Sequence, residues 1–209
     1  MEQARASAAI LAAGRRLGAR GLIAAGEGNL SIRLDMDRLL ITPSGRRKDE
    51  LDDGDLVVVR VGDAEREARS PSGLPPSSDL AIHLAVHASR PDVGAVAHAH
   101  LPASMALTMA GEIPDPAALP ETALLLPRLP LVPYGEMGST DLADRIAAAL
   151  TDEPEPLPGA VLLERHGAVA VGPGLETAVD RLELIEVLCR AWRDALLLRA
   201  ARAALDRPV

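Results

Sequence analysis

The chain has 209 residues, of which 48% are hydrophobic, and it carries a formal net charge of -8 at pH 7. This length suits one substantial core, so we expect a single domain over residues 1–209. The acidic balance argues against a nucleic-acid partner, which would require clustered basic side chains. The one cysteine, Cys189, excludes an intramolecular disulfide and a cysteine-rich zinc site. With no secretory signal and no apolar stretch long enough for a bilayer, we expect a cytoplasmic protein without a membrane partner.

The first half of the chain predicts a helix followed by three strands. Apolar and alanine residues recur at helical spacing over residues 2–19. Three short apolar runs separated by turns predict an antiparallel meander, at residues 30–34, 39–42 and 56–61. A loop rich in Pro, Ser and Gly over residues 68–76 closes at Ser77 and Ser78, which we expect to cap a helix that ends near Arg90.

The second half predicts further strands and helices of one α/β domain. Its expected elements are a strand at 93–98, a helix at 102–110, a proline-rich crossover at 113–133, a helix capped by Ser139 or Thr140 that runs to Leu150, strands at 160–163 and 168–171, and a closing helix at 175–205. An acidic, Pro-rich stretch at 152–158 could pass for a linker, but too little chain follows it for a second core. The pattern predicts a mainly antiparallel sheet covered by helices.

Two histidines at a strand end suggest a metal site. In His98-Ala99-His100 the period of two places both imidazoles on one face of the strand, so they can converge on one ion. Zinc bound by imidazole prefers four ligands, and a third histidine from elsewhere is therefore expected. His166 is the natural candidate, because it also follows a strand and precedes Gly167, which permits a sharp turn.

The other two histidines have a different expected role. His83 and His87 lie four residues apart on a predicted helix, which is also a spacing of metal ligands. Nothing near them in the sequence completes a site. We therefore expect them to pack in the interior or face solvent.

Three short polar turns are candidates for phosphate binding. They are Gly26-Glu27-Gly28-Asn29, Thr42-Pro43-Ser44-Gly45 and Ser77-Ser78. Glycine allows a close backbone approach to an anion, and the start of a helix offers free N–H groups and a positive dipole end. Each turn alone is an ordinary structural feature, but the three could meet in one pocket.

Seven segments, taken in chain order, carry a family resemblance. They are Gly28-Asn29-Leu30-Ser31, Ile41-Thr42-Pro43-Ser44-Gly45, Pro76-Ser77-Ser78-Asp79, Arg90-Pro91-Asp92-Val93, His98-Ala99-His100, Val132-Pro133-Tyr134-Gly135 and Glu164-Arg165-His166-Gly167. Together they span nearly the whole chain. In these segments the sequence resembles the class II aldolase/adducin family. The resemblance implies a three-layer α/β/α sandwich that assembles as a homotetramer, with active sites between subunits.

The resemblance also implies roles for individual residues. Zn²⁺, or another divalent metal, would be bound by His98, His100 and His166. The phosphate of a small sugar phosphate would be held by Asn29, Ser44, Gly45, Ser77 and Ser78.

Asp79 stands where aldolases of the family carry a catalytic Glu, whereas the epimerase branch carries Asp there as a metal ligand. Asp79 is therefore either a catalytic base or a fixed ligand, and its alternative is to complement the helix dipole. The sequence lacks the C-terminal tyrosine common in the family. This leaves the proton donor unassigned, with Glu121 in the crossover as a candidate.

The expected function is that of a metal-dependent aldolase. It would cleave a ketose phosphate, similar to L-fuculose 1-phosphate, into dihydroxyacetone phosphate and an aldehyde through a metal-stabilised enediolate. The alternatives are a sugar-phosphate 4-epimerase and a decarboxylase, which share this chemistry. An adducin-like assembly module without enzymatic activity is disfavoured, because all three histidines are present.

Overall fold

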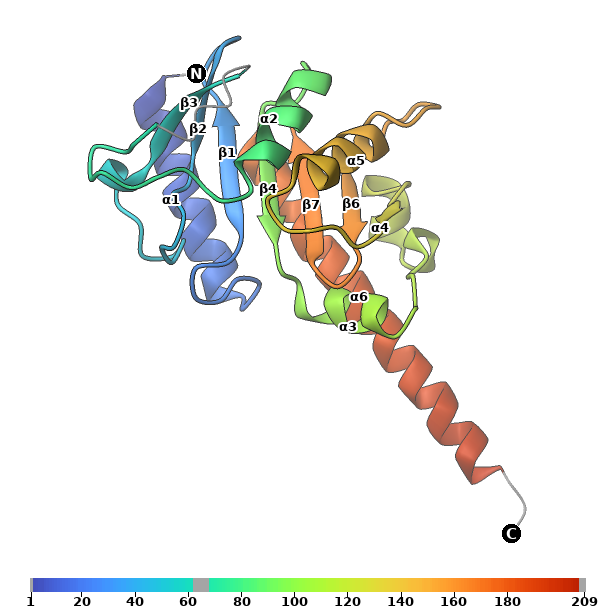
Figure 1. Cartoon of the computed structure of the whole chain (residues 1–209). Helices are drawn as coiled ribbons and strands as arrows, with labels where there is room; N and C mark the ends of the chain where they lie inside the picture. Colours follow the sequence, from blue (N-terminus) through green and yellow to red (C-terminus); the bar gives the residue numbers. More distant parts are fainter. Residues whose placement is uncertain (1, 62–67, 207–209) are drawn as a thin grey trace.

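The computed structural model describes residues 2–61 and 68–206 and is built around one seven-stranded sheet (Figure 1). The strand order is β3-β2-β1-β4-β7-β6-β5. Only the β5–β6 pair is parallel, so the sheet is mainly antiparallel, as predicted. The strands are β1 (Asn29–Arg33), β2 (Arg38–Ile41), β3 (Val57–Arg60), β4 (Ala95–Ala99), β5 (Leu131–Val132), β6 (Ala160–Leu163) and β7 (Gly167–Gly172).

Helices cover both faces of the sheet and complete an α/β/α sandwich (Figure 1). One face packs against α1, α3 and α6, and the other against α2 and α5. The helices are α1 (Gln3–Ala19), α2 (Leu80–Ser89), α3 (Pro102–Met109), α4 (Pro120–Leu125), α5 (Thr140–Leu150) and α6 (Leu175–Leu205), with short 3-10 turns η1 (Asp53–Asp55) and η2 (Pro116–Ala118). No helix in the described part of the chain is both long and apolar enough to cross a membrane.

Alternation along β4 and β1 sorts side chains between the two faces. In β4, Ala95, Ala97 and Ala99 pack in the α6 layer, while Val96 packs with α2 and α5. Alanines on the first face allow α6 to lie close to the sheet. His98 falls in step with Val96 and therefore projects towards the α2 layer. In β1 the apolar Leu30 and Ile32 likewise join the α6 layer, so the polar residues between them face α2.

Several predicted elements are confirmed. The helix expected at residues 2–19, the antiparallel meander and the closing helix at 175–205 all form within a residue or two of the expected bounds. Ser139 caps α5 as predicted, because its Oγ accepts the N–H of Leu142 at 3.2 Å.

The predicted caps of α2 are wrong. This helix begins at Leu80, and Asp79 holds the N-cap position without a side-chain capping bond. The chain stays extended up to Ser77, because the N–H of Ser77 donates to the Thr42 carbonyl at 3.1 Å and Pro76 bridges Pro43, and residues 78–79 then form a turn into the helix. The carboxylate of Asp79 is therefore left to interact elsewhere.

The crossover at 113–133 contains more structure than its prolines suggest. It holds η2, α4 and the edge strand β5, which the sequence did not predict because two residues show no periodicity. The acidic stretch at 152–158 does not separate two sheets, since β6 lies between β5 and β7 directly after it. The predicted domain, 1–209, includes positions 1, 62–67 and 207–209, which lie outside the described residues.

Gly167 is required by the turn that joins β6 to β7. Its φ is +107°, and a Cβ atom there would lie 2.2 Å from the carbonyl oxygen of Ala99.

We expect Gly167→Ala to lower the free energy of unfolding by at least about 2 kcal/mol, from backbone strain and overpacking. Chemical denaturation of the metal-free protein measures this. Gly174→Ala is the matched control, with an extended backbone and no atom within 4 Å of the added Cβ, and should cost less than about 1 kcal/mol.

Candidate metal centre

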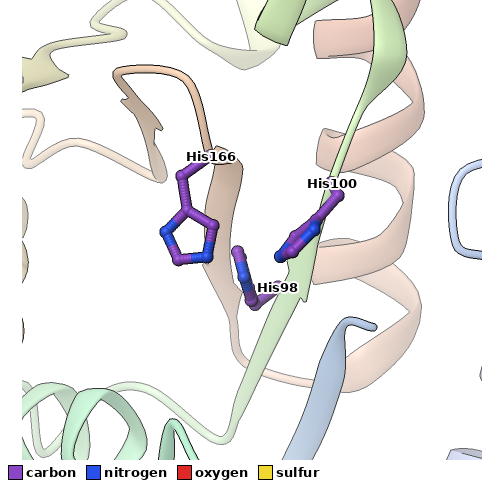
Figure 2. Close-up of side chains that lie close together, drawn as sticks. All are labelled: His98, His100 and His166. Carbon is purple, nitrogen blue, oxygen red and sulfur yellow. The ribbon is translucent and has the colours of Figure 1, made fainter. Parts of the chain in front are cut away.

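Three histidine rings from two distant parts of the chain converge at one end of the sheet (Figure 2). Ring centroids lie 5.0 Å apart for His98 and His100, and 4.8 Å apart from each of these to His166. One candidate ligand atom from each ring lies within 4.8 Å of the others. The pairing of Ala99 with Ala168 across β4 and β7 produces this convergence, because the turn before β7 must then lie beside the end of β4.

The ring of His98 is oriented for metal binding. Its Nδ1 lies 2.9 Å from the carbonyl oxygen of Ala168, and a carbonyl only accepts, so Nδ1 carries the proton. Nε2 therefore presents its lone pair to the cluster. Complete burial, and then the neighbouring rings of His166 and His100, hold the pKa of His98 well below its usual value. The imidazole is neutral, as a metal ligand must be.

A carboxylate orients the second ring in the same way. Oε2 of Glu27 lies 2.9 Å from Nδ1 of His100, so the N–H of that ring donates to the carboxylate and Nε2 is free for an ion. Oε1 of Glu27 accepts the N–H of Ala24 at 2.7 Å, which holds the side chain in place. In the sequence, Glu27 was singled out only as part of a glycine turn. Nothing in its local pattern indicated a distant histidine as its partner.

Three buried polar atoms at or beside this centre have no hydrogen-bond partner. They are Nε2 of His98, Nε2 of His166 and Oδ1 of Asp79. Oδ2 of Asp79 lies 4.0 Å from Nε2 of His98. Buried polar atoms that lack a partner are costly, and imidazole nitrogens and carboxylate oxygens can both donate lone pairs to an ion. A divalent cation held by the three rings would satisfy the two ring nitrogens, and carboxylate oxygen is also a ligand that zinc accepts.

A cavity of about 150 Å³ adjoins the histidines. Asp79 and His100 line it together with every residue predicted to hold phosphate. These residues are Asn29, Ser44, Gly45, Ser77 and Ser78. The three polar turns, separate in the sequence, therefore meet in one hollow beside the metal centre.

Lys48 adds a positive charge to this cavity that was not assigned from the sequence. Its Nζ donates to the carbonyls of Gly26 at 2.5 Å and Arg46 at 2.8 Å, which ties together the two glycine-containing turns. Burial lowers the pKa of the Lys48 ammonium to about 8, partly offset by the charges of Asp79 and Glu27. In the sequence, the one feature that could have drawn attention to Lys48 is that it is the only lysine of the chain.

A larger hollow of about 550 Å³ lies along α6, but its chemistry is less suited to a reaction. Its charged residues are all in ion pairs: Arg20 with Glu183, Arg190 with Glu186, and Asp180 with Arg16, which does not line the hollow. Among the described residues, none that lines it has a buried side-chain polar atom without a partner. The cavity beside the histidines remains the better candidate.

Glu121 does not join the cluster within this chain. It is exposed in α4, which packs against α6. His98 projects from the opposite face of the sheet. Glu121 is therefore not placed to act as a proton donor at its own subunit's histidines.

His83 and His87 lie on the buried face of α2 and outside the three-histidine cluster, in keeping with one of the two expectations for them. Both hydrogen-bond to Ser31, and His83 also contacts Asn29. Burial lowers the pKa of His83 to about 4 and that of His87 to about 3. The two rings are therefore neutral members of a buried polar network.

The chain is similar to known proteins in both sequence and fold. The family model described as Class II Aldolase and Adducin N-terminal domain matches residues 8–193. A 3-oxo-tetronate 4-phosphate decarboxylase of Haemophilus influenzae is 33% identical over 83% of this chain and 80% of the relative. A 5-methylthioribulose-1-phosphate/5-deoxyribulose-1-phosphate aldolase of Rhodospirillum rubrum is 35% identical over 88% of this chain and 79% of the relative. The crystal structure of L-fuculose-1-phosphate aldolase from Thermus thermophilus superposes with a TM-score of 0.79 and 28% identity, covering 95% of this chain and 98% of that one.

The geometry predicts that the chain binds about one divalent ion through the three rings. Elemental analysis after chelation, reloading and dialysis should find this ion in the wild type and lose most of it in His166→Ala. The control is His87→Gln, which replaces a buried histidine outside the cluster and should keep its metal. Full occupancy in the His166→Ala protein would contradict the site.

Proposed function

Because this chain belongs to the class II aldolase and adducin family, we propose that it is a metal-dependent lyase that breaks a carbon–carbon bond in a small sugar phosphate. One observation carries the proposal. Buried ring nitrogens of His98 and His166 lack hydrogen-bond partners in a three-histidine cluster beside a cavity that is lined by the turns predicted to hold phosphate. We favour an aldolase that releases dihydroxyacetone phosphate and an aldehyde from a ketose phosphate similar to L-fuculose 1-phosphate.

The proposed metal is Zn²⁺, held by His98, His100 and His166, although another divalent ion could serve. Neutral imidazoles suit zinc, and the bonds from Ala168 and Glu27 fix which nitrogen of each of two rings faces the ion. When bound, the ion supplies electrostatic stabilisation of the negative charge that develops on the substrate's oxygens.

The substrate phosphate is proposed to lie in the cavity of about 150 Å³. The hydroxyls of Ser44, Ser77 and Ser78 and backbone N–H groups near Gly45 are donors suited to its oxygens. Lys48 contributes a positive charge from below the turns. An anchored phosphate leaves the carbonyl end of the substrate facing the histidines.

Asp79 is proposed as the catalytic base. It is buried, lies between the phosphate cavity and His98, and has one carboxylate oxygen without a partner. Its carboxylate is placed to take a proton from the substrate carbon at which the bond breaks and to return it. The absence of a capping bond at the start of α2 supports this role over a purely structural one.

A decarboxylase is the second candidate. A relative at 33% identity carries that name, and losing carbon dioxide leaves the same negative charge on the substrate as aldol cleavage. A sugar-phosphate 4-epimerase remains an alternative, since the epimerase branch of the family carries Asp at the position of Asp79. An adducin-like module without activity is disfavoured by the orphaned lone pairs, which such a module would not need.

We further propose that the chain acts as a single domain in the cytoplasm and assembles as a homotetramer with active sites between subunits. The end of α6 extends beyond the sheet and exposes Leu197, Leu198 and Leu205 (Figure 1). Exposed apolar side chains along one helix are typical of a surface covered by a partner. A neighbouring subunit could also supply the proton donor.

The function is tested with a panel of ketose phosphates and 3-keto acid phosphates incubated with zinc-loaded enzyme. Products should include dihydroxyacetone phosphate for an aldolase, carbon dioxide for a decarboxylase or an epimer for an epimerase. Phosphorylated sugars should react in preference to free ones. Equal turnover of both forms would contradict the phosphate site.

Ser78→Ala should raise KM for the phosphorylated substrate about tenfold to a hundredfold, since a hydrogen bond to a charged group is worth about 1.5 to 3 kcal/mol. Steady-state kinetics measure the change. Ser89→Ala at the other end of α2 is the control and should leave KM near that of the wild type, because Ser89 bonds only to a carbonyl of its own helix.

Asp79→Ala separates the two proposed roles of this carboxylate. Loss of a base should leave zinc bound and abolish exchange of the α-proton of dihydroxyacetone phosphate in deuterium oxide. Loss of a fixed ligand should instead weaken zinc binding. Retained zinc with wild-type proton exchange would exclude both roles.

A further inference from the structure

A row of buried polar side chains lies between β1 and α2 and ends at Asp79. On β1, Asn29 and Ser31 alternate with apolar residues and face the helix. On α2, His83 and His87 are separated by one helical turn and share a face. All four are at most 3% exposed, so each hydrogen bond in the row is shielded from water.

Four hydrogen bonds join the row into one chain. Nε2 of His87 lies 3.0 Å from Oγ of Ser31, which lies 2.7 Å from Nδ1 of His83. Nε2 of His83 lies 2.6 Å from Oδ1 of Asn29. Nδ2 of Asn29 donates to Oδ2 of Asp79 at 2.9 Å. The row therefore runs from His87 to the carboxylate beside the metal centre.

The direction of every bond follows from its end at Asp79. An ionised carboxylate only accepts, so Asn29 must present its NH₂ group to Asp79 and its carbonyl oxygen to His83. Nε2 of His83 must then carry the proton. A buried neutral imidazole has one N–H, so Nδ1 of His83 accepts the hydroxyl proton of Ser31. The oxygen of Ser31 in turn accepts from Nε2–H of His87.

We propose that His83 is a positioning residue for catalysis, which acts through the amide of Asn29 to hold the Asp79 carboxylate in its orientation beside the histidine cluster. This inference rests on the proposed function of Asp79. A flipped Asn29 amide would place an oxygen against the carboxylate and an NH₂ group against the N–H of His83. Both contacts would be repulsive while Nδ1 of His83 accepts from Ser31, so the Asp79 carboxylate and the N–H on Nε2 of His83 together select a single orientation of the amide.

The arrangement leaves Asp79 with one oxygen occupied and one free. Oδ2 accepts from Asn29, and Oδ1 has no partner. Asn29 also pairs directly with His98 across β1 and β4 and lines the phosphate cavity. A substitution of His83 would therefore affect the reaction through the Asn29 amide and would leave the three metal-binding rings in place.

Two substitutions of His83 separate positioning from packing. In His83→Gln the side-chain NH₂ group reaches the place of Nε2 and can still donate to Asn29. In His83→Asn the shorter side chain reaches only the place of Nδ1 and loses that donor. Both replace a ring with a primary amide; because Asn is one methylene smaller than Gln and a weaker helix former, the free energy of unfolding of both variants is measured alongside.

The readout is the exchange of the α-proton of dihydroxyacetone phosphate with deuterium oxide by zinc-loaded enzyme. We expect His83→Asn to slow exchange about tenfold to a hundredfold, because a buried acceptor loses its partner, and His83→Gln to stay within about threefold of wild type. Zinc content should equal that of the wild type in both variants. Equal losses in the two variants, or loss of zinc in both, would overturn the positioning role.

A second measurement does not depend on activity. In the wild type, ¹H–¹⁵N NMR should show His83 and His87 with the proton on Nε2, and a side-chain NH₂ signal of Asn29 shifted by its bond to a carboxylate. His83→Gln should preserve the Asn29 signal, and His83→Asn should lose the shift. If the wild type fails to exchange the proton but these signals behave as expected, the proposed function fails and the positioning network stands. A proton on Nδ1 of His83 would overturn the network itself.

Discussion

The antiparallel pairing of β4 with β7 is the interaction on which the site depends. It sets Ala99 opposite Ala168 and so places the turn carrying His166 beside the His98-Ala99-His100 segment. A shift of one residue in this register would turn His98 into the α6 layer, because side chains alternate between the faces of a sheet. Small residues make the register possible: alanines of β4 lie beneath α6, and Gly167 admits the carbonyl of Ala99.

Burying polar side chains on the α2 face of the sheet costs free energy, because these groups lose their hydrogen bonds to water. The hydrogen bonds between β1 and α2 offset this loss only in part. Asn29, Ser31 and His83 satisfy one another, whereas lone pairs at His98, His166 and Asp79 remain without partners. Free energy released when these atoms bind a cation would also stabilise the fold, since an ion that binds only the native state shifts the folding equilibrium. Binding of a cation at this centre would therefore add to the stability of the sandwich.

The framework of the site and the residues that would contact the substrate lie in different parts of the chain. Strands β1 and β4 hold Asn29 and His98 side by side, while the cavity proposed to hold phosphate is formed by turns at strand and helix ends. Loops can change without disturbing a core. This division agrees with a family in which relatives similar to this chain are named as a decarboxylase and as an aldolase.

The sequence alone determined the α/β class, the antiparallel meander, the long closing helix and the three histidines, because these depend on local periodicity and on residue types with distinctive chemistry. Only the tertiary structure placed Glu27 against His100, freed the Asp79 carboxylate from capping and paired the two-residue β5 with β6. Those features arise from contacts between residues far apart in the chain, which no local pattern encodes. The orientation of the Asn29 amide is of the same kind, since it is imposed jointly by an imidazole on α2 and a carboxylate at the start of that helix.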